Sequence, residues 1–260
     1  MPVTIDDAVS SLVEAERTKK PIEAFHFSSR GISVQEAYQI QLGYVRERKA
    51  KGAAIVGKKI GLTSKAMQEM LNVDQPDYGH LLDDMVHENN SVISLDPYIK
   101  PRVEFEIAFV LNKDLKGPGV TAEDVINATS HVVPAIEIID SRISDWKIKF
   151  EDTVADNGSS AGAIFGEGTR SLDTIDLPNV EMKVYRNGEF LDEATGAAVM
   201  GNPISAVAWL ANAVGEYDIS LKAGEKILAG ALSKAVDVEG GDEFKAEFLG
   251  LGTVHAAFEK

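Results

Sequence analysis

Three glutamates in two apolar segments are the residues of this chain whose spacing most directly suggests chemistry. In residues 101–111, Glu104 and Glu106 alternate with apolar residues, so on a β-strand both would point to the same face. Their Cα atoms would lie roughly 7 Å apart, from a rise of about 3.3 Å per residue. Glu137 lies in the apolar segment VVPAIEIID, where an unpaired carboxylate is costly. A divalent cation bound by all three glutamates is the simplest common reason for them.

A solvated strand face is the alternative interpretation of Glu104 and Glu106, and these two residues alone do not decide between the alternatives. Glu137 favours the metal site, because buried carboxylates are usually paired or bound to a cation. Lys59 read alone is a surface lysine, and Lys58 beside it is expected to be solvated. Asp77 read alone is a turn residue next to Pro76.

Composition restricts the possible partners and reaction classes. The chain has 260 residues, of which 44% are hydrophobic and 26% charged, as in an ordinary folded protein. Its formal net charge of -15 argues against nucleic acid as a partner, since phosphate binding requires a basic surface. An anionic small substrate is compatible with this charge where a cation is present locally. The absence of cysteine excludes disulfides, thiolate metal ligands and cysteine nucleophiles.

The N-terminal segment MPVTIDDAVSSLVEAERTKK lacks the apolar core of a signal peptide. No stretch approaches the ~18 uninterrupted apolar residues of a membrane span. We therefore expect a cytoplasmic protein with no membrane partner.

The order of predicted elements indicates an α+β fold with a mixed, largely antiparallel β core. Strands do not alternate regularly with helices, which argues against a doubly wound sheet. Asn187-Gly188 lies between alternating segments and predicts a hairpin. Two helices precede the first strand, so we divide the chain into a helical N-terminal segment (1–52) and a β-rich catalytic domain (53–260). The predicted elements include helices at residues 4–20, 33–51 and 202–215, strands at 53–62 and 101–111, and a turn-rich segment at 73–85.

Five motifs, in order along nearly the whole chain, resemble the hydratase and decarboxylase branch of the fumarylacetoacetate hydrolase superfamily. They are GKKIGLTSKAM (57–67), DQPDYG (74–79), PRVEFEIAFVL (101–111), PAIEIIDSRISDWKIKFEDTVADN (134–157) and NPISAVAWLAN (202–212). The resemblance implies a β core like the C-terminal domain of that family. One departure is Gly158, where the family pattern has alanine, and it leaves the positions of Ser159 and Ser160 open.

The resemblance also implies roles for particular residues. Glu104, Glu106 and Glu137 would hold a Mg²⁺ or Mn²⁺ ion. Lys59 and Asp77 would be the acid and base groups, and Ser159 would bind the substrate together with Lys59. These roles agree with the metal site that strand periodicity predicts.

The activity implied is the addition of water to 2-hydroxypenta-2,4-dienoate, giving 4-hydroxy-2-oxopentanoate, in the meta-cleavage degradation of aromatic compounds. Asp77 in DQPDYG and Trp146 after Asp145 favour this hydratase activity over the alternative, decarboxylation of 2-oxo-3-hexenedioate (4-oxalocrotonate). A non-catalytic metal-dependent oxo-acid-binding or scaffold protein is a further alternative. The partners implied are a small anionic 2-oxo or 2-hydroxy acid and other copies of the chain in a homo-oligomer. A complex with a pathway decarboxylase is left open.

Overall fold

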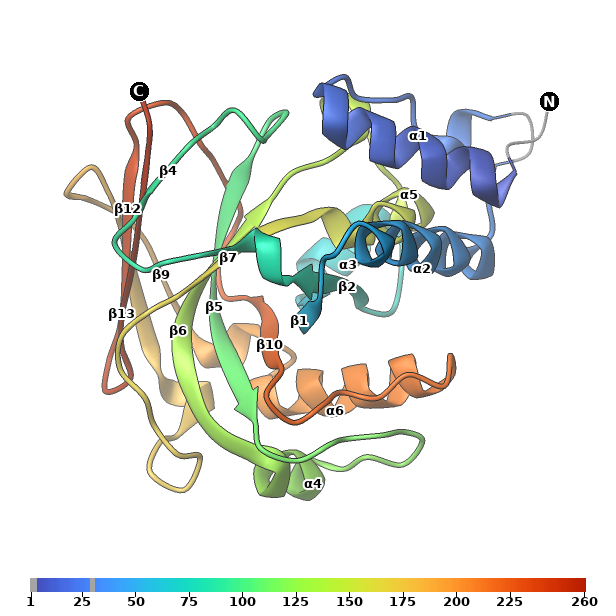
Figure 1. Ribbon diagram of the computed structural model, residues 1–260. Coiled ribbons are helices and arrows are strands. Elements are labelled where there is room, and N and C mark those ends of the chain that lie inside the picture. The colour runs from blue at the N-terminus through green and yellow to red at the C-terminus, as the bar shows by residue number, and fades with distance from the viewer. Residues whose placement is uncertain (1–3, 29–30) are drawn as a thin grey trace.

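Two β-sheets share one apolar core, as Figure 1 shows for the computed structural model, which describes residues 4–28 and 31–260. The larger sheet has the strand order β2 (Asp77–Leu82), β1 (Ile55–Gly61), β10 (Lys226–Ala231), β5 (Arg102–Leu111), β6 (Thr129–Ile139), β7 (Ser160–Phe165) and β3 (Val86–His87), and β11 (Val236–Asp237) pairs with β5. The smaller sheet has the order β4 (Val92–Ile93), β13 (Gly252–Phe258), β12 (Glu243–Phe248), β8 (Glu181–Arg186) and β9 (Glu189–Thr195).

Within the described part of the chain, the parallel strand pairs are β1 with β10, β3 with β7 and β4 with β13, and the other pairs are antiparallel. The α+β fold with a largely antiparallel β core is therefore confirmed. The α-helices are α1 (Ile5–Thr18), α2 (Val34–Ala50), α3 (Lys65–Leu71), α4 (Ala122–Ala128), α5 (Phe150–Ala155) and α6 (Pro203–Gly215). The short 3-10 helices are η1 (Phe25–Phe27), η2 (Asp83–Met85), η3 (Ser144–Trp146), η4 (Asn157–Ser159), η5 (Leu177–Asn179) and η6 (Gly196–Ala198).

The helices begin where capping residues predict. The hydroxyl of Ser33 accepts from the backbone N–H of Glu36, whose carboxylate accepts in return from the backbone of Ser33, so α2 begins with a capping box. Helices α1 and α2 pack against each other and join the same core as the strands. The division of the chain at residue 52 stays a prediction.

Strand β5 has one apolar face and one face that carries two glutamates. Val103, Phe105 and Ile107 are fully buried on one face, and the ring of Phe105 lies 6.2 Å from that of Phe244 in the smaller sheet. This face forms the core between the two sheets. Glu104 and Glu106 alternate with these residues and therefore point to the opposite face of the larger sheet.

The turn-rich prediction for residues 73–85 is wrong over its second half. Strand β2 begins at Asp77, directly after Pro76, and Gly79 lies inside it, paired with Lys59. The turn signals of Pro76 and Gly79 are overridden because β2 covers the edge of β1 and is buried along its whole length.

One helical stretch of the described residues, Gly196–Gly215, is long and apolar enough to cross a membrane by length and composition, and 44% of its apolar window is buried. Helix α6 occupies most of it and packs against β10 and α4, with Val207, Leu210 and Val214 fully buried. A core helix meets the same criteria, and this packing places α6 in the core.

Replacing Phe105 by alanine should lower the free energy of unfolding by about 3–5 kcal/mol, because the cavity left between two packed sheets cannot collapse. Urea denaturation of wild type and variant measures the difference. Phe190→Ala is the matched control, since Phe190 is 56% exposed on edge strand β9 and should change stability by less than about 0.5 kcal/mol. Equal losses in the two variants would contradict the assignment of Phe105 to the core between the sheets.

Candidate metal centre and active site

The pairing of β5 with β6 brings the three glutamates together. Glu104 lies directly opposite Glu137 in the antiparallel register, and Glu106 lies two residues further along the same face. One carboxylate oxygen of each lies within 4.8 Å of the other two. All three are buried, with exposed fractions of 6% for Glu104 and 0% for Glu106 and Glu137. The solvated-face interpretation is therefore wrong.

Three carboxylate oxygens of this cluster, which we call the acidic triad, have no hydrogen-bond donor among the described residues. Glu106 Oε2 accepts from the backbone N–H of Gly230 at 2.7 Å, but Glu106 Oε1 and both oxygens of Glu137 have no hydrogen-bond partner among the described residues. Burial raises the pKa of all three carboxyls, and the neighbouring carboxylates raise that of Glu106 further. Burial raises the pKa of Glu137 to about 7. Three buried oxygen ligands without donors fit a hard divalent cation.

Lys59 of β1 supplies the positive charge that the chain itself brings to the acidic triad. Its Nζ lies 3.7 Å from Glu137 Oε2, and the residue is 3% exposed. Burial alone would lower the pKa of Lys59, but Glu137, followed by Asp77 and Glu104, outweighs burial and raises it. Lys59 is therefore a protonated ammonium beside the triad.

Lys58 was predicted to be solvated, and this is wrong. It is 1% exposed and pairs with Glu225, with 2.8 Å between Nζ and Oε2. Successive residues of β1 point to opposite faces, and both faces are covered. Lys58 therefore lies on the face of β1 away from Lys59.

Asp77 of β2 can lie beside Lys59 of β1 because its partner on β1, Gly61, has no side chain. Gly61 pairs with Asp77, and a Cβ atom at Gly61 would lie 2.2 Å from Asp77 Oδ1 and 3.0 Å from Lys59 Nζ. Only glycine leaves room for both charged groups at this point. Asp77 is 2% exposed, and its Oδ2 accepts from the hydroxyl of Thr153 at 3.3 Å. Its Oδ1 has no hydrogen-bond partner in the described part of the chain.

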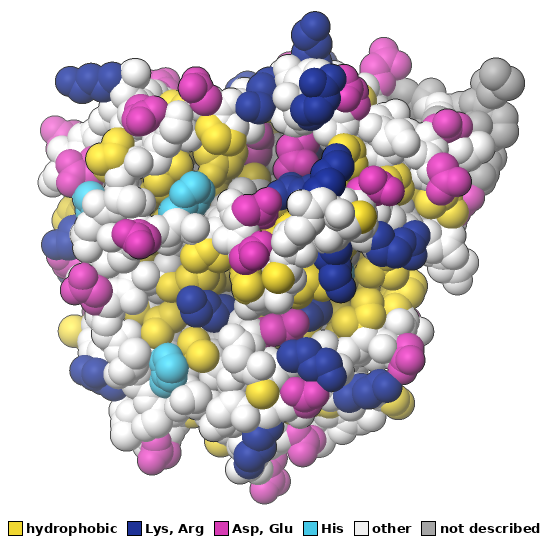
Figure 2. All heavy atoms as spheres, in the orientation of Figure 1, with side chains coloured by type: hydrophobic (Ala, Val, Ile, Leu, Met, Phe, Trp, Pro, Cys, Tyr) yellow, Lys and Arg dark blue, Asp and Glu magenta, His cyan; other side chains and the backbone are white. Residues whose placement is uncertain are grey.

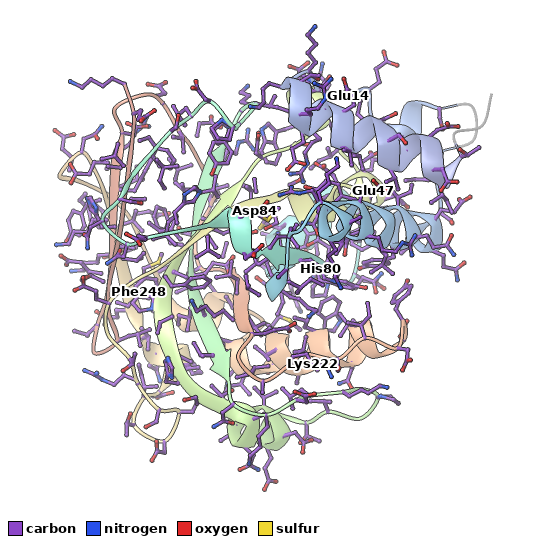
Figure 3. All side chains as sticks on the ribbon, in the orientation of Figure 1. Glu14, Glu47, His80, Asp84, Lys222 and Phe248 are labelled. Atoms are coloured by element: carbon purple, nitrogen blue, oxygen red, sulfur yellow. The ribbon has the colours of Figure 1, made fainter. Side chains whose placement is uncertain are left out.

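The loop that carries Ser159 is held against β2 by two hydrogen bonds between the Asn157 side chain and the backbone of β2. Asn157 accepts from the backbone N–H of His80 at 2.8 Å and donates to its carbonyl at 2.9 Å. His80 lies in the interior, on β2 beneath α2 (Figure 3). Asn157, Gly158 and Ser159 all have positive φ values, which turn the buried hydroxyl of Ser159 toward the cavity.

Gly158, the departure from the family pattern, has a φ of +61° and a virtual Cβ 3.1 Å from Lys59 Cε. A glycine suits this position because it adopts positive φ without strain and leaves the lysine side chain in place.

These residues line one cavity of about 190 Å³. Lys59, Asp77, Glu104 and Ser159 are at its wall, and Glu106 and Glu137 adjoin Glu104 in the triad. Thr153 and Arg102 also line the cavity and were not predicted as site residues. Arg102 had a signal, since it lies two residues before Glu104 and so on the same strand face. The remaining lining residues include Leu62, Thr63, Met67, Ile139, Trp146, Ile148, Ala231 and Ala235.

Three larger hollows, of about 650, 690 and 500 Å³, contain none of the predicted site residues. The first lies between α2 and α6, where hydrophobic side chains gather on the face shown in Figure 2. Elsewhere on that face acidic and basic side chains are interspersed (Figure 2). The cavity with the acidic triad is therefore the candidate active site.

The chain is similar to a known protein family along most of its length. The family model described as fumarylacetoacetate (FAA) hydrolase C-terminal matches residues 36–259. The chain is 46% identical over 249 residues to 2-hydroxyhexa-2,4-dienoate hydratase of Comamonas testosteroni, which covers 95% of this chain and 94% of the relative. It is 42% identical over 258 residues to 2-keto-4-pentenoate hydratase of Paraburkholderia xenovorans (strain LB400), covering 99% and 96%.

A solved structure with the same fold is the 4-oxalocrotonate decarboxylase from Pseudomonas putida G7, complexed with magnesium and adipate. It matches with a TM-score of 0.94 and 35% sequence identity over 98% of each chain.

Replacing Glu106 by glutamine should remove most of the stabilisation that Mg²⁺ gives. At a hundred times its dissociation constant, Mg²⁺ should raise the melting temperature of the wild type by about 5–10 °C, from about 2.7 kcal/mol of binding free energy. Thermal unfolding with and without Mg²⁺ measures this shift. Glu123→Gln, an exposed position on α4, should keep the full shift. A full shift in Glu106→Gln would contradict the metal site.

The metal-free protein should lose stability as the pH rises toward 7 and above. The pKa of Glu137 is about 7 in the folded chain, above its ordinary value of 4.5, so the stabilising protonated form is fully present below about pH 4.5 and is lost as the pH passes 7. Urea denaturation in a chelator, compared between wild type and Glu137→Gln across this range, isolates the contribution. A constant difference between the two proteins would contradict the raised pKa.

Proposed function

The chain belongs to the fumarylacetoacetate hydrolase family, and on that premise we propose that it is a hydratase that adds water to 2-hydroxypenta-2,4-dienoate and releases 4-hydroxy-2-oxopentanoate. One observation carries this proposal: a protonated lysine and an aspartate with a free oxygen line one cavity together with Glu104, and the rest of the buried acidic triad adjoins it. Two relatives that are named as hydratases, at 46% and 42% identity, support hydration as the reaction.

Glu104, Glu106 and Glu137 are the residues that would hold the ion, which we assign as Mg²⁺ or Mn²⁺. Their donors are carboxylate oxygens alone, which these two ions accept and which are less suited to softer metals. When bound, the ion supplies a Lewis acid for the carboxylate and 2-oxygen of the substrate. With three protein ligands, the ion would still have room to accept oxygens of a bound substrate.

Lys59 stabilises negative charge on the 2-oxygen. Its ammonium is held protonated by the neighbouring carboxylates and is almost fully buried, so water does not screen it. A preorganised cation at the oxygen where charge develops lowers the barrier without any rearrangement during the reaction.

Asp77 moves the protons. Its free Oδ1 takes the proton of the 2-hydroxyl and returns it at C5, which converts the dienol to the conjugated 2-oxopent-3-enoate. Asp77 then positions the water whose oxygen adds at C4 while a proton is delivered to C3, so one water is consumed for each product formed. Thr153 holds the other oxygen of Asp77 during these transfers. Ser159, whose hydroxyl has no partner among the described residues, donates a hydrogen bond to the substrate.

Decarboxylation of 2-oxo-3-hexenedioate is the second candidate function, because the solved decarboxylase shares the fold at 35% identity. In that reaction the same groups would stabilise a dienolate after loss of carbon dioxide. The substrate in both cases is a small anionic oxo acid. Assembly into a homo-oligomer, a complex with a pathway decarboxylase and a cytoplasmic location stay predictions.

Product analysis separates the candidates. The protein is incubated with Mg²⁺ or Mn²⁺ and either 2-hydroxypenta-2,4-dienoate or 2-oxo-3-hexenedioate. Formation of 4-hydroxy-2-oxopentanoate from the first acid supports the hydratase. Carbon dioxide from the second acid without hydration of the first would establish the decarboxylase, and binding of either acid without turnover would favour a non-catalytic oxo-acid-binding protein.

Asp77→Asn should lower kcat by about 10²–10⁴-fold, because amide nitrogen and oxygen cannot accept and return the substrate proton. The Mg²⁺-dependent thermal shift should be retained, since Asp77 is not in the acidic triad. Asp74→Asn makes the same charge change at an exposed position three residues away and should leave kcat unchanged. A kcat within twofold of wild type in Asp77→Asn would remove Asp77 from the mechanism.

A further inference from the structure

The part of the cavity away from the acidic triad is mostly apolar, and its polar side chains include Arg102 and Thr63. The apolar wall is formed by Leu62, Met67, Ile139, Ile148 and Ala235. If the head of the substrate binds at the triad and Lys59, its tail must occupy this remaining space. Among the lining residues, Arg102 is the one cation besides Lys59 that the tail can meet.

Arg102 reaches this position because it lies two residues before Glu104 on the same face of β5. Its guanidinium carbon lies 4.5 Å from the centre of the Trp146 ring, and the indole N–H of Trp146 donates to the carbonyl of Lys100 at 3.2 Å. The tryptophan thus holds the guanidinium plane against the mouth of the cavity.

The charge of Arg102 is balanced by Asp237. β11 pairs with β5 so that Asp237 lies directly opposite Arg102, and Arg102 Nε donates to Asp237 Oδ1 at 2.7 Å. A second carboxylate on the substrate would therefore approach a neutral pair instead of a free cation. It would also lose water against a wall that is mostly apolar, where the hydroxyl of Thr63 is a single neutral donor and compensates only in part. An uncharged alkyl tail has no charge to desolvate there, and its burial against the apolar wall is favourable.

We propose that Asp237 is a specificity-determining residue that acts through Arg102: their pairing makes the cavity select 2-hydroxydienoates with a short uncharged tail over those that end in a second carboxylate. This inference rests on the proposed function and concerns the tail alone. Asp237 is a positioning residue, since it does not line the cavity.

The test compares two acids that differ only at the last carbon. One is 2-hydroxyhexa-2,4-dienoate, which ends in a methyl group, and the other is 2-hydroxyhexa-2,4-dienedioate, which ends in a carboxylate. Wild type with Mg²⁺ should show the higher kcat/KM for the monoacid. Asp237→Asn, which keeps the shape and removes the charge, should raise the ratio of diacid to monoacid kcat/KM by about fivefold, the size expected for a partly exposed charge interaction.

Three further variants test whether Asp237 changes the ratio of diacid to monoacid kcat/KM through its pairing with Arg102. Asp237→Glu keeps the charge and should keep the wild-type ratio. Asp218→Asn makes the same change in net charge at an exposed ion pair with Lys116, outside the cavity lining, and should also keep it. In an Arg102→Gln background, Asp237→Asn should leave the ratio unchanged, which a merely structural role of Asp237 does not predict.

A binding measurement separates failure of this inference from failure of the proposed function. Calorimetric titration with Mg²⁺ and either 2-oxohexanoate or 2-oxohexanedioate repeats the comparison without turnover. If no hydration occurs, the proposed hydratase function is overturned. If the protein nevertheless binds 2-oxohexanoate more tightly than 2-oxohexanedioate, and Asp237→Asn reduces this preference, the inference about Asp237 is supported. A wild-type preference for the diacid, or an equal ratio in wild type and Asp237→Asn, would overturn this inference whether or not hydration occurs.

Discussion

Burying three carboxylates within 4.8 Å of one another is unfavourable unless positive charge is placed among them, and this constraint shapes the centre of the molecule. The chain meets it in part with the Lys59 ammonium and with the backbone N–H of Gly230. The oxygens that still lack donors define the place for a divalent cation. The Lys59 ammonium and the cation that offset the repulsion within the triad are also the charges that the proposed reaction uses.

The rigidity of the cluster comes from the strands that carry it. The β5 and β6 ladder is paired continuously from Arg102 to Val110, so Glu104 and Glu137 cannot separate without breaking the centre of the larger sheet. On the reverse face of β5, Phe105 and its neighbours are buried against the smaller sheet. Core packing on one face thus sets ligand positions on the other, and no flexible loop is required to place the three acids.

How far the sequence predicts this site depends on whether the signal is local. The period of two in residues 101–111 identified Glu104 and Glu106, and the cost of an unpaired buried charge identified Glu137, because both arguments need only the neighbouring residues. The burial of Lys58 and the strand at Asp77 could not be predicted, since both depend on elements distant in sequence: Glu225 next to β10, and the position of β2 beside β1. Thr153 had no signal, because its contact with Asp77 joins residues 76 positions apart.

The adjacent lysines of β1 have a consequence for how the strand finds its place during folding. Lys59 faces the cavity, and Lys58 faces away and meets Glu225. A strand slipped by one residue would bring either Gly57 opposite Glu225 or Ile60 beside the acidic triad, so either Glu225 or the triad would lose its lysine. It would also move Gly61 away from Asp77, which needs the space beside it. The two lysines together therefore disfavour a misaligned β1 in either direction, and only the native register satisfies Glu225 and the triad at once.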